Sequence, residues 1–211
     1  MRTTMHVSVR HATLHDAPAL TSTLVNALVD TPDAEWFIPD EESRRAVYAE
    51  LCAGLIDYVL DNRSGAVYTV DAHSAVGIWY PDTSTPPNLV AFLSHAHAHT
   101  PAAERIRLAE AALAAHTPSI RHHRLGYLAV APDRQCTGLG TALLRHRHAT
   151  FDAAGIPAYL VATSTGNRDL FARHGYRLMR QAPIRLPHGG PTFWPMWRQP
   201  CAVEALPRNP G

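Results

Sequence analysis

The stretch LGYLAVAPDRQCTGLGTALL, residues 125–144, decides the fold of this chain. Its first residues, Leu125 to Val130, are apolar enough to predict a buried strand, which Pro132 brings to an end. Gly138 and Gly140 then open an apolar helix. The first N–H groups of a helix have no partner inside it, and the helix dipole adds partial positive charge there. Because glycine lets a phosphate approach the backbone closely, the stretch predicts a site for a phosphate or pyrophosphate group.

The spacing of these glycines does not fit two common phosphate-binding motifs. A P-loop needs a lysine directly after its second glycine, and the chain contains no lysine. A dinucleotide-binding fingerprint needs Gly-x-Gly-x-x-Gly after the first strand of its domain, whereas this strand lies past the middle of the chain. Glycines also allow a helix to pack tightly against a strand, so a purely structural role is the alternative.

A more specific pattern is Gln135-x-x-Gly138-x-Gly140 after the sequence LAV-x-P. It resembles the acetyl-CoA signature of the GNAT superfamily of N-acetyltransferases. Residues 156–177 resemble the next strand, helix and Gly-aromatic turn of that superfamily, and residues 7–20 resemble its first strand and helix. The resemblance covers most of the chain. Within the superfamily, the sequence is most similar to antibiotic-modifying enzymes of the puromycin N-acetyltransferase type.

The order of apolar patterns predicts an α/β (α+β) fold. Strands are expected at residues 5–10, 65–70, 75–80, 125–130, 158–162, 176–186 and 192–198. Helices are expected at 16–29, 40–59, 88–98, 101–115 and 168–174, besides the one that Gly138 opens. With the resemblance, this implies a single GNAT-like domain over residues 1–199, whose mixed, mostly antiparallel sheet of six to seven strands has helices on both faces. We expect a loop at residues 30–39 and a proline-rich, flexible tail at 200–211.

Composition favours a soluble cytoplasmic enzyme. The 19 basic and 18 acidic residues leave a net charge of +1, which argues against nucleic acid as a partner. No apolar run approaches the ~20 residues of a membrane span, and the first residues lack the apolar core of a signal peptide. Three widely spaced cysteines predict neither a disulfide framework nor a zinc site. We expect a monomer or a homodimer.

A metal is not expected at the tract formed by His95, His97 and His99. On a helix only His95 and His99 share a face, and Ala96 stands where the zinc-protease pattern needs a glutamate. A solvated helix face is the simpler interpretation.

The resemblance implies acetyl-CoA as co-substrate. Backbone N–H groups at the start of the helix would surround its pyrophosphate, with Arg134 as a charged contact, and the preceding strand would pair with its pantetheine arm. The predicted coenzyme-binding residues are Leu128, Ala129, Val130, Arg134, Gln135, Cys136, Thr137, Gly138, Leu139, Gly140, Thr141, Asn167 and Phe171.

The resemblance also locates the catalytic groups. A backbone N–H, that of Val130 or Leu128, would polarise the thioester carbonyl. The usual acid of the superfamily is a tyrosine four residues after the motif asparagine, but here that residue is Phe171. Water, Tyr127, Tyr176 or Cys136 would then protonate the leaving thiolate. His122 and His123 are candidate bases, and strand alternation sends them to opposite faces. The predicted catalytic set is Val130, Tyr127 and His123.

The acceptor is predicted to be the amine of a small molecule, such as an aminonucleoside or another antibiotic. The segment before the second long helix carries acids that can bind an amine, Asp30, Asp33 and Glu35, and two aromatic residues, Trp36 and Phe37. Trp79 and Tyr80 adjoin on a strand and must point to opposite faces, so one of them can line the site. Surface acids and core aromatics are the simpler alternatives. A protein N-terminal or lysine acetyltransferase and a non-catalytic CoA-binding sensor are the competing functions.

Overall fold

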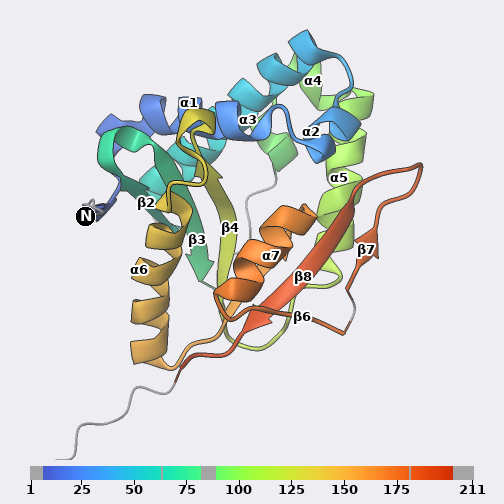
Figure 1. Cartoon of the computed structure of the whole chain (residues 1–211). Helices are drawn as coiled ribbons and strands as arrows, with labels where there is room; N and C mark the ends of the chain where they lie inside the picture. The colour runs from blue at the N-terminus through green and yellow to red at the C-terminus, as the bar shows by residue number, and fades with distance from the viewer. Residues whose placement is uncertain (1–6, 63, 82–88, 181, 202–211) are drawn as a thin grey trace, which may run out of the picture.

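The computed structural model describes residues 7–62, 64–81, 89–180 and 182–201. One eight-stranded sheet runs through them in the order β1-β2-β3-β4-β5-β8-β6, and β7 pairs with β8 (Figure 1). Only β4 and β5 are parallel to each other; the other pairs are antiparallel. The strands are β1 Val9–His11, β2 Ala66–Val70, β3 Ala75–Pro81, β4 His123–Val130, β5 Ala158–Ala162, β6 Arg177–Leu178, β7 Ile184–Arg185 and β8 Thr192–Arg198.

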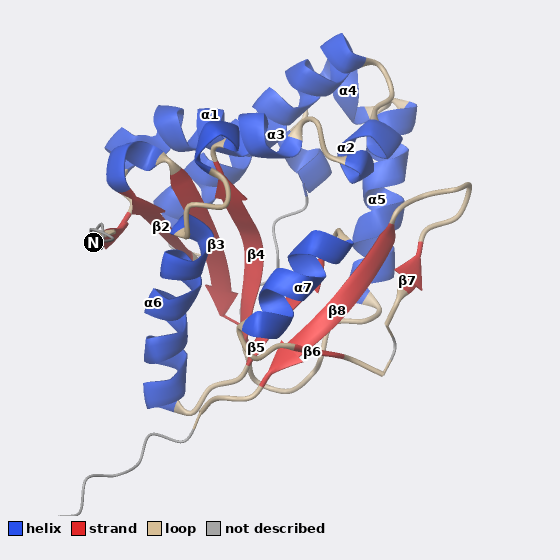
Figure 2. Ribbon diagram, viewed as in Figure 1, coloured by secondary structure: helices blue, strands red, loops and turns tan. Residues whose placement is uncertain are grey.

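Helices cover both faces of this sheet (Figure 2). One face packs against α1 and α3 around buried residues such as Leu24, Ile56 and Ile78. The other packs against α6 and α7 around residues such as Leu143 and Phe151. The helices are α1 Ala17–Leu28, α2 Pro32–Phe37, α3 Glu41–Asn62, α4 His95–Ala98, α5 Pro101–Ala114, α6 Leu139–Ala154 and α7 Thr165–Arg173. The predicted mixed, mostly antiparallel sheet with helices on both faces is therefore confirmed.

Two details of the predicted element order are wrong. Residues 30–39 contain the helix α2 rather than only a loop, because Pro32 takes its first position and Asp33 and Glu35 lie in its first turn. Residues 176–186 do not form one strand. A turn in which the Ala182 N–H donates to the Met179 carbonyl separates β6 from β7, which raises the strand count to eight. The predictions for residues 5–6, 82–87 and 202–211 lie outside the described residues.

The feature that positions the site is a divergence of β4 from β5. The two strands pair only from His123 opposite Ala158 to Leu125 opposite Leu160, although β4 continues to Val130. Figure 2 shows β4 and the strands beyond it separating toward the end where β4 leads into α6. The carboxyl-terminal half of β4 therefore has one edge that no strand covers.

A β-bulge in the same strand changes which side chains face which helices. Trp79 of β3 is opposite Leu125, but Ile78 is opposite Tyr127, so Gly126 is the extra residue. As a result Leu125 and Leu128 both face the core under α6, while Tyr127 faces the core under α1 and α3. The bulge at Gly126 thus directly follows Leu125, the last residue of β4 that pairs with β5.

Candidate functional site

The open edge of β4 presents backbone groups to a ligand. The Ala131 N–H donates to the Ser74 carbonyl beside β3 at 2.9 Å. Because successive N–H groups alternate between the two edges of a strand, those of Val130 and Leu128 point to the edge that β5 leaves. At that edge the Gln135 side-chain amide donates to the Val130 carbonyl at 3.4 Å. An extended ligand can pair here as an added strand would.

The start of α6 adds a cluster of unpaired amides next to this edge. Cys136 and Gly138 have φ angles of 60° and 92°, which turn the chain sharply into the helix. The first backbone bond of the helix runs from the Ala142 N–H to the Gly138 carbonyl at 2.9 Å. Within the described part of the chain, no group accepts a hydrogen bond from the amides of Cys136 to Thr141. A 16-residue helix behind them adds its dipole.

Space for an anion exists in front of these amides. A Cβ built on Gly138 would meet no atom within 4 Å, and one on Gly140 would make ordinary contacts of 3.7 Å with Leu128 and Val130. The helix start therefore lies directly over the end of β4. An anionic head group at the amides and an extended arm along β4 can belong to one molecule.

Comparison with known proteins shows which fold this is. No protein-family model matches the chain. A solved structure from Corynebacterium glutamicum, described as histone acetyltransferase HPA2 and related acetyltransferase, superposes with a TM-score of 0.67 at 24% identity, covering 95% of this chain and 100% of that one. The fold is that of the GNAT-family acetyltransferases.

Two further GNAT-fold structures extend the likeness. A mosquito protein, arylalkylamine N-acetyltransferase like 5b, has a TM-score of 0.60 at 14% identity. The paiA N-acetyltransferase of Thermoplasma acidophilum, solved with coenzyme A, has a TM-score of 0.53 at 12% identity. Each match covers 92% of this chain and 99% of the other. The likeness to the GNAT fold thus extends over 92% of the chain.

In this GNAT fold, Phe171 does not reach the open edge. Its side chain is 5% exposed and packs in the core under α7, with its ring centre 5.9 Å from that of Tyr176. The Tyr176 hydroxyl lies 3.1 Å from His148 Nε2 in the same core. Asn167 is exposed, and its N–H donates to the capping hydroxyl of Ser164 at 3.1 Å. The position of the superfamily's acid is therefore filled by a buried apolar ring.

Tyr127 is the tyrosine of the diverging part of β4. It is partly buried on the face under α1 and α3. Burial raises its pKa well above the usual range, and the neighbouring Tyr80 and Cys52 raise it further. The phenol therefore carries its proton at neutral pH.

The two candidate histidines lie on opposite faces, as alternation predicts. His122 packs beside Tyr159 and Trp197, with ring centres 5.5 and 5.6 Å away. His123 stacks on Phe151 of α6, with ring centres 4.4 Å apart and planes 11° from parallel. His123 is the first residue of β4 and His122 precedes it, so both lie at the end where β5 is paired with β4.

The predicted acceptor residues of the α2 segment are only partly brought together. Asp30 and Glu35 are exposed, whereas Asp33 is partly buried, and burial raises its pKa. Trp36 and Phe37 form an edge-to-face pair at 5.3 Å. The pair is anchored to α5, because Arg105 donates to the Trp36 carbonyl at 2.8 Å.

Trp79 and Tyr80 also separate as predicted. Trp79 is 1% exposed and fills the core under α6, where Arg147 lies 5.9 Å from its ring. Tyr80 faces the other side and lies against the bulge, since a Cβ on Gly126 would come within 2.5 Å of its ring. Of the two aromatics, Tyr80 is therefore the one beside the diverging strands.

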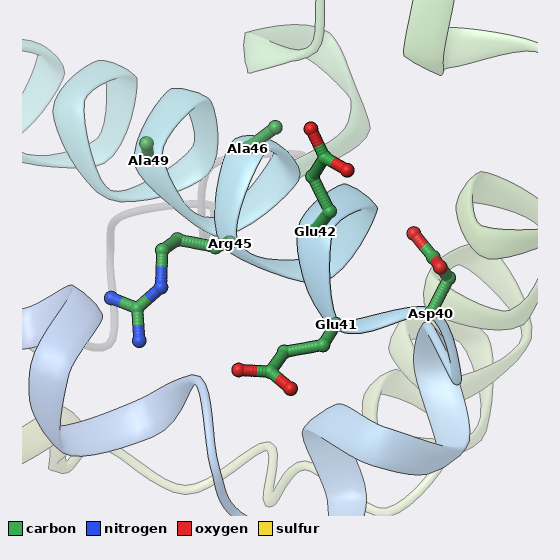
Figure 3. Close-up of a pocket in the computed structure, with 6 residues that line it drawn as sticks. All are labelled: Asp40, Glu41, Glu42, Arg45, Ala46 and Ala49. Atoms are coloured by element: carbon green, nitrogen blue, oxygen red, sulfur yellow. The ribbon is translucent and has the colours of Figure 1, made fainter.

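A separate surface hollow lies on the outer side of α3 (Figure 3). Its lining residues are Asp40, Glu41, Glu42, Arg45, Ala46 and Ala49. All are exposed and come from one helix and the residue before it, and Figure 3 shows their side chains pointing away from a common centre. We therefore assign no catalytic or binding role to this hollow.

A metal site and a membrane-spanning helix are two other features that the described residues could contain. In the described ranges, no group of three or more His, Cys, Asp or Glu side chains is arranged to hold a metal ion. His97 pairs with Glu50 at 3.0 Å. Among the helices that the structure describes, none is both long and apolar enough to cross a bilayer.

Proposed function

We propose that the protein is an acetyl-CoA-dependent N-acetyltransferase that acts on the amine of a small molecule. The observation that carries this proposal is the set of unpaired amides from Cys136 to Thr141 beside the uncovered edge of β4. Its support from known proteins is the shared GNAT fold, one of whose structures contains coenzyme A and another of which is named an arylalkylamine N-acetyltransferase.

The proposed coenzyme site uses main-chain groups almost throughout. The amides at the start of α6 bind the diphosphate, with Arg134 as a charged neighbour, and the N–H groups of Leu128 and Val130 pair with the pantetheine arm. Coenzyme A supplies the acetyl group as a thioester. The Val130 or Leu128 N–H stabilises the charge that develops on the carbonyl oxygen, an effect of about 10²–10³ in rate for comparable donors.

Tyr127 is the proposed proton donor. Attack of the neutral amine on the acetyl carbon breaks the carbon–sulfur bond, and the departing thiolate needs a proton. Tyr127 holds one on its phenolic oxygen at neutral pH, and burial raises the pKa of this phenol further. Phe171 cannot do this, and the hydroxyl of Tyr176 is already paired with His148 in the core. The amine loses its own proton to water or to Asp33, the partly buried acid of α2.

Acetyl transfer is tested by following thiol release from acetyl-CoA with a panel of amines. The panel includes an arylalkylamine, a polyamine, an aminonucleoside antibiotic and a peptide with a free N-terminus. Saturable release with a small amine is the expected result. Release with the peptide alone would favour a protein acetyltransferase. CoA binding without release for any amine would favour a sensor, the alternative that the buried Phe171 suggests.

A further inference from the structure

One arginine beside the divergence of β4 and β5 has no anionic partner. Arg124 is partly buried, and neither a hydrogen bond nor an ion pair joins its guanidinium to any described residue. The guanidinium carbon of Arg124 lies over the ring of Tyr80, 5.1 Å from the ring centre. A guanidinium has five N–H donors, so the group is free to bind the oxygens of a ligand.

The other buried arginines show how this chain treats such a group. Arg44 donates to backbone carbonyls, among them that of Val29 at 2.7 Å. Arg147 donates to the Tyr68 hydroxyl at 2.7 Å. Arg198 forms a two-bond pair with Asp152, both at 2.7 Å. Each of these three guanidinium groups donates to a group of the fold, although Arg147 Nε has no partner among the described residues. Arg124, by contrast, donates to no described residue.

The surroundings of Arg124 are aromatic and hydroxyl-bearing rather than acidic. Tyr80 is opposite it on β3, Tyr159 is opposite it on β5, and Trp197 follows Tyr159 on β8. Burial lowers the pKa of Arg124, and the groups that oppose this are the phenols of Tyr80, Tyr127 and Tyr159. No carboxylate of the described chain compensates its charge.

A second unpaired donor lies beside it. The Tyr80 side chain is 1% exposed, and its hydroxyl has no hydrogen-bond partner among the described residues. Tyr80 and Arg124 share the face of β3 and β4 that also carries Tyr127, the proposed proton donor. Two groups without a hydrogen-bond partner, the Arg124 guanidinium and the Tyr80 hydroxyl, therefore lie on the face of β4 that carries the proposed proton donor.

We propose that Arg124 binds an anionic oxygen group of the acceptor, so that the preferred substrates are amines that also carry a carboxylate or a phosphate. The inference rests on the proposed acetyltransferase function and narrows its substrate class. The planar fork of arginine fits two oxygens of such a group. Of the neighbouring aromatic residues, Tyr80 and Tyr159 are fully buried, and Trp197, which is partly exposed, can contact the rest of the molecule. An amine without an acidic group would leave the fork unpaired.

Matched amines test this directly. Values of kcat/KM are measured for L-tyrosine against tyramine, L-phenylalanine against phenethylamine, and phosphoethanolamine against ethanolamine. The wild-type enzyme should prefer the acidic member of at least one pair. Arg124→Gln should reduce that preference by about 10- to 100-fold, mainly through KM, as expected for a lost charged hydrogen bond. The two acid types show whether the group is a carboxylate or a phosphate.

Control variants separate this role from a loss of charge or fold. Arg121→Gln removes an exposed cation three residues earlier and should leave the preference unchanged. Arg124→Lys keeps the charge but not the fork, so it should retain part of the preference. Affinity for CoA, measured by calorimetry, should be the same in all variants.

The inference is overturned if the wild type prefers the amines without an acidic group, or if Arg124→Gln keeps the preference. If CoA binds but no pair is acetylated, the affinities of N-acetyl-L-tyrosine and N-acetyltyramine for the CoA-saturated protein are compared, and equal affinities overturn it. Absence of CoA binding would instead defeat the proposed function, which is a separate result.

Discussion

The two proposed binding surfaces beside β4, one for the coenzyme and one for the acceptor, differ in the chemical groups that form them. The proposed coenzyme side consists of main-chain amides from one continuous stretch of chain, those of Leu128, Val130 and Cys136 to Thr141. The proposed acceptor side consists of side chains from separate elements, namely Asp33 on α2, Tyr80 on β3 and Arg124 with Tyr127 on β4. The first side can change its side chains and keep its function, whereas each residue of the second contributes its own chemistry. Variants on the two sides should therefore have separable effects, on CoA affinity for one and on turnover for the other.

The largest effect is a loss of CoA affinity at the start of α6, and the far end of the same helix provides the control. Gly138→Glu places a carboxylate before the unpaired amides and should lower CoA affinity at least about 1000-fold, or about 4 kcal/mol, through repulsion and steric exclusion of phosphate. Gly155→Glu is the matched control, because Gly155 also has a positive φ, of 64°, and no atom within 4 Å of a built Cβ. Calorimetry with CoA should show normal affinity for Gly155→Glu. Equal affinities in the two variants would remove the assignment of the coenzyme side.

The next effect concerns the proton donor on the acceptor side. Tyr127→Phe should lower kcat by about 100-fold, the lower limit for general acid–base catalysis, because the phenolic proton is lost. CoA affinity should not change. Stopped-flow measurement of thiol release gives the rate. An unchanged kcat would assign the proton to water and leave Tyr127 as a wall of the site.

The coenzyme side could be predicted from the sequence because its residues are consecutive. A strand, a turn and a glycine-rich helix start imply unpaired amides wherever the rest of the chain lies. On the proposed acceptor side, Asp33, Tyr80 and Tyr127 could be named only as alternatives, because their meeting depends on how separate elements pack. For Tyr127 the face also depends on the bulge at Gly126. A glycine inside a strand is a signal for such a bulge. Trp79 and Phe171, expected at the site, lie in the core under α6 and α7.

The third effect tests whether Phe171 is a core residue. Phe171→Tyr adds a hydroxyl to a side chain that is 5% exposed, so it should lower the free energy of unfolding by about 1–3 kcal/mol. It should not raise kcat, since the ring does not face the open edge. Urea denaturation and the thiol-release assay measure the two quantities. A faster enzyme would show that this position still serves as the acid.

The smallest effect is a pH dependence from Asp33. Burial raises its pKa, so the folded protein binds this proton more readily than the unfolded chain, and its charge costs stability as pH rises above the ordinary value of 3.8. Asp33→Asn should therefore be more stable than wild type at pH 7, and the gain should vanish well below pH 3.8. Urea denaturation at both pH values checks this. A destabilised Asp33→Asn at pH 7 would mean that the hydrogen bond of the carboxylate with the Thr31 side chain outweighs the cost of its burial.

Hydrogen exchange of the backbone amides of Cys136 to Thr141, followed by NMR with and without CoA, tests the central claim most directly. These amides should exchange rapidly in the free protein, since no described group accepts from them, and should become protected when CoA is saturating. The amides near Gly155, at the other end of α6, should not change. Rapid exchange of Cys136 to Thr141 in the presence of bound CoA would contradict the proposed coenzyme site.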